Sequence, residues 1–280
     1  HKTNSDGKIK ISTDYPDYIP FMMYAKDTDA RKRLRFEFSN RAYPQNTEVL
    51  NNLIKKRYEL AQLLGYDNYA DYVVENKMIK KSSEVESFIE KISLIAKDGA
   101  NREKQTMLTR KKQDDENAKE IFSYESSYLE ELIKKENFAF DSQKVREYFQ
   151  YGEVRKGLLA LTSKLFGITY KENKEQKVWH DAVTVYDVYR GNARIGTIYL
   201  DMHPRENKYK HAAQFTLKSG LKGTQLPEGV LVCNFPDPGK TTGPALMDHD
   251  QVVTFFHEFG HLLHHVLGGD QSWLMFSGVA

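Results

Sequence analysis

Hydrophobic residues recur every three or four positions through most of the first 166 residues, which is the spacing of amphipathic helices. The clearest case runs from Thr47 to Leu64, where Gly65 follows as a helix stop. The expected helices cover residues 27–41, 47–64, 68–75, a segment starting at Ser83, 124–135 and 142–166. Residues 8–18 are compatible with a short hairpin. The mixed charges of residues 101–119 are typical of a solvated helix face or a helix connection.

After residue 180 the pattern changes to alternation. Val183–Tyr189 alternates, Gly191 and Asn192 form a turn, and Ile195–Asp201 returns as a second strand. Further strands are expected at 211–217 and 230–235. Many helices beside a small, mainly antiparallel sheet indicate the α+β class, mainly α-helical. We therefore expect a mainly helical region over residues 1–180, and a sheet with a final helix over residues 181–280.

The final helix is expected over residues 244–267, with a stop at Gly268 and Gly269. Its expected buried stripe consists of Val252, Phe256, Phe259, Leu263, Val266 and Leu267. The helix contains the sequence HEFGH at residues 257–261. Residues four apart share a helix face, so His257 and His261 can present two imidazoles to one zinc ion. Glu258 is then placed to take a proton from metal-bound water.

The alternative is a chance pattern on a structural helix. Two imidazoles and a carboxylate near a buried stripe are costly without a partner, and a bound cation would satisfy all three. Gly260 costs about 1 kcal/mol relative to Ala inside a helix. Close approach of a substrate or of another backbone segment is one reason to tolerate it. Both observations favour metal binding over the chance pattern.

Composition excludes several classes of function. The net charge is +2 with 29% charged residues, so no overall field favours nucleic acid. No run of eighteen apolar residues is present to span a membrane, and no secretory leader is visible. Cys233 is the single cysteine, which fits a reducing compartment, and we expect it to be buried and inert in a cytoplasmic protein.

Several stretches together resemble the thimet oligopeptidase, oligopeptidase A and dipeptidyl carboxypeptidase family of zinc metallopeptidases. They are HEFGHLLH at 257–264, YLDMHPRENKY at 199–209, RYELAQLLGYDNYADY at 57–72, and the pair Trp179 and His180. One position departs from the family pattern, since Asn207 stands where the family usually has glycine.

The resemblance implies a zincin-like, two-lobed helical molecule with a deep channel, a small antiparallel-rich sheet beside the HExxH helix, and cleavage of short unfolded peptides. It also implies one zinc ion held by His257, His261 and a glutamate on the next helix. By alignment with the stretch Phe276-Ser277-Gly278, that glutamate falls beyond Ala280. We therefore expect a second polypeptide to complete the catalytic unit, as a split or nicked partner in a heterodimer, or else the sequence to be a fragment. The starting residue, His1 instead of Met, fits a processed or excised piece.

Substrate contacts are expected at His211, Ala212 and Ala213, in what the pattern indicates is an edge strand. Small side chains permit the close backbone approach that strand addition needs. His264 and His265 are interpreted as packing residues or as partners of the ligands. Two other hypotheses stay open: a non-catalytic helical peptide-binding or scaffold protein with an incomplete metal site, and a zinc hydrolase acting on something other than peptides. Endopeptidase and dipeptidyl carboxypeptidase activities are both compatible with the sequence.

Overall fold

The computed structural model describes residues 5–277, and the chain divides into two compact units. The first comprises residues 1–13 and 17–133, and the second comprises residues 14–16 and 134–280. Within residues 5–277 there are nine α-helices and one five-stranded sheet, so the α+β class is confirmed. The two-lobed channel and the boundary at residue 180 stay predictions. No helix formed by residues 5–277 is long and apolar enough to cross a membrane.

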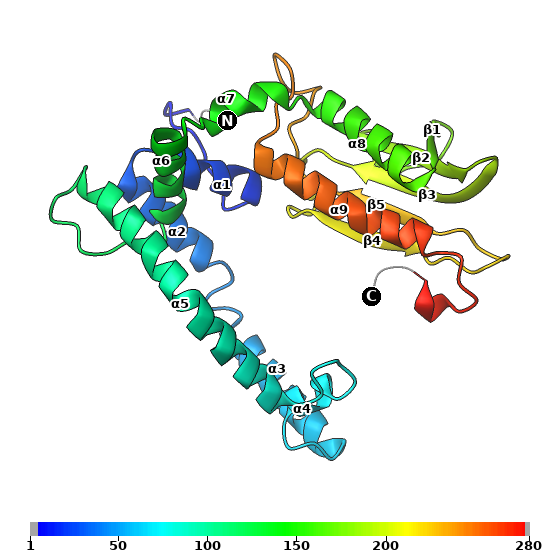
Figure 1. Cartoon of the computed structure of the whole chain (residues 1–280), viewed down its shortest axis with the longest axis horizontal. Coiled ribbons are helices and arrows are strands. Elements are labelled where there is room, and N and C mark those ends of the chain that lie inside the picture. The colour runs from blue at the N-terminus through cyan, green and yellow to red at the C-terminus, as the bar shows by residue number, and fades with distance from the viewer. Residues whose placement is uncertain (1–4, 278–280) are drawn as a thin grey trace. The chain divides into compact units, whose positions relative to one another are not determined.

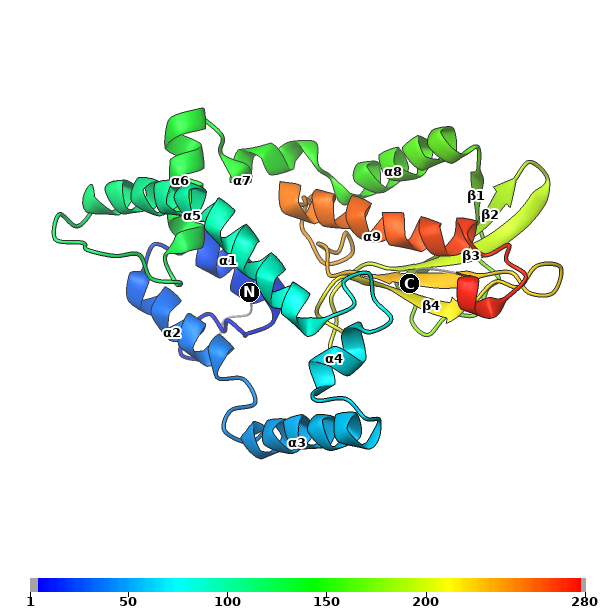
Figure 2. The ribbon, with the colours of Figure 1, turned by 60° about the horizontal axis from the view of Figure 1, so that its bottom comes forward.

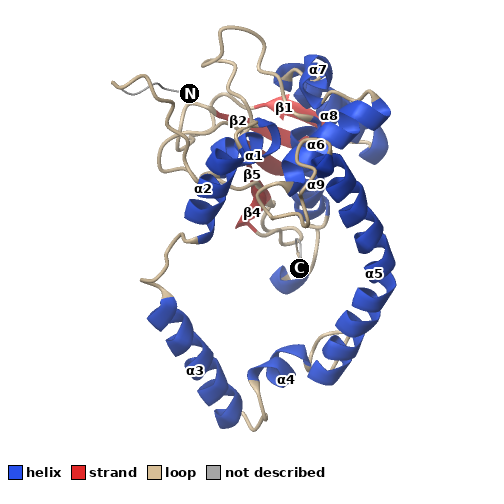
Figure 3. Ribbon diagram, turned by 90° about the vertical axis from the view of Figure 1, so that its left-hand side faces the viewer, coloured by secondary structure: helices blue, strands red, loops and turns tan. Residues whose placement is uncertain are grey.

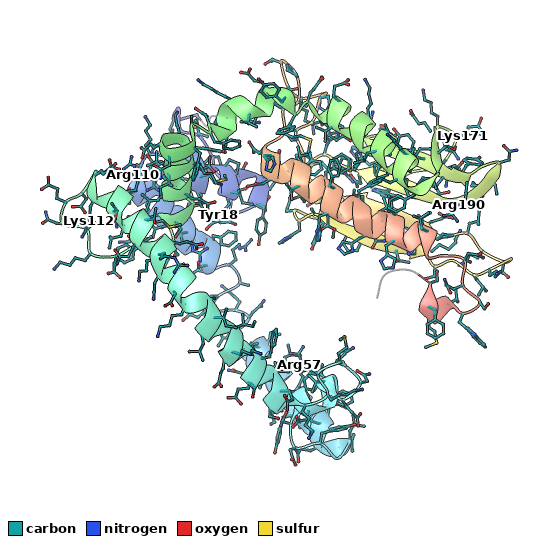
Figure 4. The ribbon with its side chains drawn as sticks, viewed as in Figure 1. Tyr18, Arg57, Arg110, Lys112, Lys171 and Arg190 are labelled. Carbon is teal, nitrogen blue, oxygen red and sulfur yellow. The ribbon has the colours of Figure 1, made fainter. Side chains whose placement is uncertain are left out.

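The first unit is helical, and the strands belong to the second unit (Figure 3). Its helices are α1 (Tyr15–Tyr24), α2 (Thr28–Ser39), α3 (Thr47–Leu63), α4 (Tyr69–Val74), α5 (Ser82–Lys112) and the start of α6 (Ser126–Phe138). The hairpin expected at residues 8–18 is wrong, since α1 begins at Tyr15 and buries Tyr18 and Met22, one turn apart. Much of the charged run forms the last part of the 31-residue α5, which contains Arg110 (Figure 4). Arg110 pairs with Asp114, just beyond the helix, at 2.8 Å.

A buried arginine holds three of these helices together. The Arg31 side chain of α2 donates to the Tyr124 carbonyl at 3.0 Å and to the Ala25 carbonyl after α1. Its guanidinium lies 4.2 Å from the ring centre of Tyr128 in α6. Bonded in this way, the cation is tolerated at 2% exposure.

The second unit contains a five-stranded sheet with both helices α8 and α9 near it (Figure 1). Its elements are α7 (Ser142–Val145), a 3-10 turn (Arg146–Tyr148), α8 (Tyr151–Phe166), β1 (Thr169–Glu172), β2 (Val183–Arg190), β3 (Ala193–Asp201), β4 (Ala213–Lys218), β5 (Glu228–Val232), α9 (His249–Leu267) and a second 3-10 turn (Leu274–Phe276). The strand order is β1-β2-β3-β5-β4, with only the β3–β5 pair parallel. One edge of the sheet is therefore β4.

The main core lies between α9, α8 and one face of the sheet. Phe255, Phe259 and Leu262 of α9 are completely buried there against Leu200 and Leu231 of the sheet. The expected stripe of α9 is right at Phe259, Leu263 and Val266 and wrong at Phe256, which is 40% exposed. The helix is rotated so that Phe255 and Leu262 meet the strands in place of Phe256.

Two helices of this unit also differ in extent from the sequence prediction. Helix α9 begins at His249 and not at Pro244, because Asp248 and Gln251 form a capping box and Leu246 pairs with Gln150 as an isolated bridge. The helix expected over residues 142–166 is divided into α7, a 3-10 turn and α8.

Candidate metal centre

Helix α9 brings the two candidate zinc ligands together. The Nε2 atoms of His257 and His261 lie 3.2 Å apart, and the ring centres are 4.9 Å apart. Two nitrogens each about 2.0–2.1 Å from a tetrahedral zinc would be about 3.3 Å apart. His257 is exposed and His261 is partly exposed, so both are open to a metal from outside the core. The pair therefore has the spacing and the imidazole nitrogen donors that zinc prefers.

Glu258 reaches a different neighbour from the two histidines. Its Oε2 atom accepts a hydrogen bond of 3.2 Å from the backbone N–H of Gln214 in β4. Backbone groups of an edge strand point alternately toward its neighbour and away from it. The bond to Glu258 therefore places Gln214 among the positions of β4 that point away from β5. The Glu258 carboxylate, next to the two candidate histidines, is thus hydrogen-bonded to the free edge of the sheet.

A third metal donor is missing from this part of the chain. Across residues 5–277, no His, Cys, Asp or Glu joins His257 and His261 to make a group of three that could hold a metal. Zinc sites in proteins use three or four protein ligands. Within residues 5–277 the candidate site therefore has two possible donors, fewer than a zinc site uses.

Two of the three candidate substrate residues lie just before the edge strand. Strand β4 begins at Ala213, where Val232 of β5 is its partner. His211 has its ring 4.3 Å from that of Tyr15, and the Asn234 amide donates to the His211 carbonyl at 3.1 Å. Ala212 packs against the main core. His211 and Ala212, which precede β4, are thus held in place by contacts with neighbouring residues.

His265 was expected only to pack or to contact a metal ligand, but its ring bonds to the sheet. It is completely buried, and its Nε2 lies 3.1 Å from both the Lys218 carbonyl and the Glu228 carbonyl. The available signal was its position seven residues after Glu258, which places both on one face of α9.

His264, by contrast, is exposed at an apolar groove between α8 and α9. Gly260 lines the same groove, and a Cβ there would meet nothing within 4 Å.

Comparisons with known proteins confirm the family resemblance. Residues 21–275 match the model of peptidase family M3. The chain is 32% identical to a thimet-like oligopeptidase of Dictyostelium discoideum over 98% of its own length and 43% of that protein. It is also 32% identical to saccharolysin of Saccharomyces cerevisiae (95% and 40%) and to oligopeptidase A of Escherichia coli (92% and 39%). The chain therefore spans about two fifths of the length of these relatives. Because the family model covers most of the sequence, this chain belongs to peptidase family M3.

Proposed function

We propose that this chain is part of a zinc oligopeptidase that hydrolyses peptide bonds in short, unfolded peptides. The observation that carries the proposal is the 3.2 Å approach of the His257 and His261 Nε2 atoms on the helix that also carries Glu258. Membership of a peptidase family supports it, and the names of the relatives point to oligopeptides as substrates. The family also favours a peptidase over a non-catalytic scaffold protein.

The residues present fit a zinc ion in donor type and spacing. His257 and His261 would hold it, and a third ligand, a glutamate, would come from outside the described residues. When bound, zinc makes water acidic enough to be deprotonated near neutral pH and polarises a carbonyl group. The glutamate would come from a second polypeptide or from another part of the same protein. The enzyme would act in the cytoplasm.

Glu258 would act as the general base. Its Oε2 is held by the Gln214 N–H, which leaves the other carboxylate oxygen to accept a proton from the attacking water and pass it to the departing amine. Because the bond fixes the carboxylate, proton transfer needs no search among rotamers.

The peptide would lie along the free edge of β4. Edge strands add an extended peptide through backbone hydrogen bonds, and small side chains let it come close. Ala213 is the first residue of the strand, and His211 and Ala212 directly precede it. The general base sits beside the next residue, Gln214, so a peptide bound there would pass the reacting groups.

The test uses Glu258→Gln in the complete enzyme, purified with any polypeptide that accompanies it. We expect hydrolysis of a short fluorogenic peptide to fall by a factor of about 10²–10⁴, because general-base catalysis contributes that much. Zinc content, measured by atomic emission, should stay the same because both histidines remain. Glu175→Gln is the matched control, since Glu175 is exposed in the loop between β1 and β2. Full turnover by Glu258→Gln, or an unsubstituted complete enzyme that binds no zinc, would contradict the proposal.

A further inference from the structure

A second buried contact ties α9 to the sheet, two helical turns beyond Glu258. His265 is completely buried, and its ring meets atoms of both β4 and β5. The Thr216 hydroxyl lies 3.4 Å from Nδ1, and the Lys218 and Glu228 carbonyls lie 3.1 Å from Nε2. The ring therefore carries a proton on Nε2, which both carbonyls share, and Nδ1 accepts from the threonine.

The two carbonyls belong to a point at which the pairing of β4 with β5 is irregular. The register of β4 against β5 shifts between Thr216 and Lys218, where Lys218 is paired with Glu228. A β-bulge interrupts the ladder and leaves backbone groups without their regular partners. A backbone carbonyl at such a point is stabilised when a donor reaches it. The imidazole of His265 supplies the donor from the helix.

A glycine in β5 lets the helix come this close. A Cβ on Gly229 would lie 2.7 Å from Leu262 Cδ1 and 3.1 Å from His265 Cδ2. Both distances are shorter than ordinary van der Waals contact. The absence of a side chain at Gly229 therefore creates the space that the His265 ring occupies.

The two tethers between α9 and β4 match in length. Glu258 and His265 are seven residues apart, which is about 10.5 Å along a helix. Their partners on β4, Gln214 at one end and Thr216 and Lys218 at the other, are about 7–13 Å apart along a strand. Figure 2 shows α9 lying along the same part of the sheet as β4. Contacts at both ends therefore oppose sliding of the helix along the strand.

We propose that His265 is a positioning residue for the peptidase reaction: its bonds to the β4 bulge set the register of α9 against the edge strand and so hold Glu258 at the Gln214 N–H. The inference rests on the proposed function, because Glu258 is the base whose place His265 fixes. A side chain that only filled space could be an aliphatic one. The imidazole is distinguished from it by the three polar atoms that it contacts.

The main test compares His265→Leu with His265→Gln in the complete enzyme. Leucine fills the space without a donor, whereas the glutamine amide offers two hydrogens for the two carbonyls. We expect kcat of His265→Leu to fall by up to about 100-fold, as misplacement by about 1 Å can cause, with KM and zinc content unchanged. His265→Gln should recover most of the lost kcat. If His265→Leu keeps its kcat, or if glutamine does no better than leucine, the proposal is wrong.

A second variant covers the case in which His265→Leu does not fold. Thr216→Val keeps the size of the side chain and removes one bond to the ring, so kcat should fall about fivefold, the equivalent of about 1 kcal/mol. Unchanged kcat in this variant would overturn the proposal. A fall in zinc content that parallels kcat would do the same, because it would place the effect on the metal.

A measurement that needs no activity separates this inference from the proposed function. Hydrogen exchange at the Gln214 amide reports its bond to Glu258 directly. We expect faster exchange in Thr216→Val and His265→Leu, and exchange at the unsubstituted rate in His265→Gln. An enzyme without zinc would defeat the proposed function while this pattern still held. Equal exchange in all forms would defeat the tether alone.

Discussion

Replacing Asp201 with alanine should strongly destabilise the second unit. Asp201 ends β3 and is 2% exposed. Its carboxylate accepts two bonds from the Arg205 guanidinium, at 2.6 and 2.8 Å, and one of 2.9 Å from the Trp179 indole. The Lys208 ammonium lies 2.9 Å from the same carboxylate. Four donor contacts thus converge on one buried anion.

The magnitude follows from Lys208, whose side chain is only 3% exposed. It also donates to the carbonyls of Asp201, His203 and Cys233, which connect the ends of β3 and β5. Without Asp201 the ammonium would stay in the core with no opposite charge, a change that costs about 3–5 kcal/mol. Arg205 is more exposed and can turn to water. We therefore expect Asp201→Ala to lower the free energy of unfolding by about 3–5 kcal/mol.

Urea unfolding followed by tryptophan fluorescence measures this loss, since Trp179 is bonded to the carboxylate. With a slope of about 2 kcal/mol per molar urea, the midpoint should fall by about 2 M. Asp181→Ala, an exposed position in the loop before β2, is the control and should change stability by less than about 0.5 kcal/mol. Removing both charges, in Asp201→Ala with Lys208→Met, should recover part of the loss. The reasoning is refuted if Asp201→Ala costs less than about 1 kcal/mol or if the double variant is no more stable than the single one.

The same cluster gives a pH dependence of definite sign. Burial opposes ionisation of Asp201, but the bonds from Arg205, Trp179 and Lys208 outweigh it and hold the pKa of the carboxyl well below its usual range. An acid whose pKa is lower in the folded state stabilises the fold above its unfolded pKa, about 3.9, and loses that contribution as the pH falls below it. Unfolding between pH 4 and pH 2 should therefore be less steep in Asp201→Asn. Equal slopes would contradict this cause.

Three further predictions concern single positions. Gly220→Ala should lower stability by about 1–3 kcal/mol, because its Cβ would lie 2.1 Å from the Gly269 carbonyl oxygen; Gly157→Ala in α8 meets nothing within 4 Å and should not destabilise in the same melting experiment. Asn207 has a φ of 59°, so Asn207→Gly should be neutral and Asn207→Val should cost about 1–2 kcal/mol by urea unfolding. Equal stability of these two variants would contradict the reason. Burial raises the pKa of Tyr170 to about 12, so its neutral form stabilises the fold below pH 10 and that contribution is lost as the pH rises toward 12; Tyr170→Phe should flatten alkaline unfolding in that range, and an unchanged profile would count against it.

Local periodicity predicted the helices whose ends are set by nearby residues. Helix α3 covers Thr47–Leu63 against an expected 47–64, and α2 lies within the expected 27–41. Helix α1 was missed because it is short and its buried side chains belong to a region too brief for a helical period to stand out. The position of Asn207 explains the family's usual glycine, since a positive φ favours Gly and tolerates Asn.

Contacts between distant segments could not be predicted in the same way. The β2–β3 hairpin follows from its turn, and the structure has it with Val183 opposite Asp201. The edge position expected for the strand at residues 211–217 is confirmed by β4, whereas the parallel pairing of β3 with β5 depends on contacts between segments far apart in the sequence. No local signal determines which strand becomes the parallel neighbour of β3.

Helix α9 carries candidate residues that local spacing can predict and others whose contacts depend on distant segments. His257 and His261 form a pair that a four-residue spacing alone can predict, because both lie on the open side of α9. Glu258 and His265 lie on the side that meets β4, and their partners are 44 and 49 residues away in the sequence. In the proposed mechanism the motif supplies the reacting groups, while long-range contacts decide where Glu258 lies against the strand. A substitution in the β4 bulge should therefore alter turnover without touching the motif, and only the folded structure can indicate such a position.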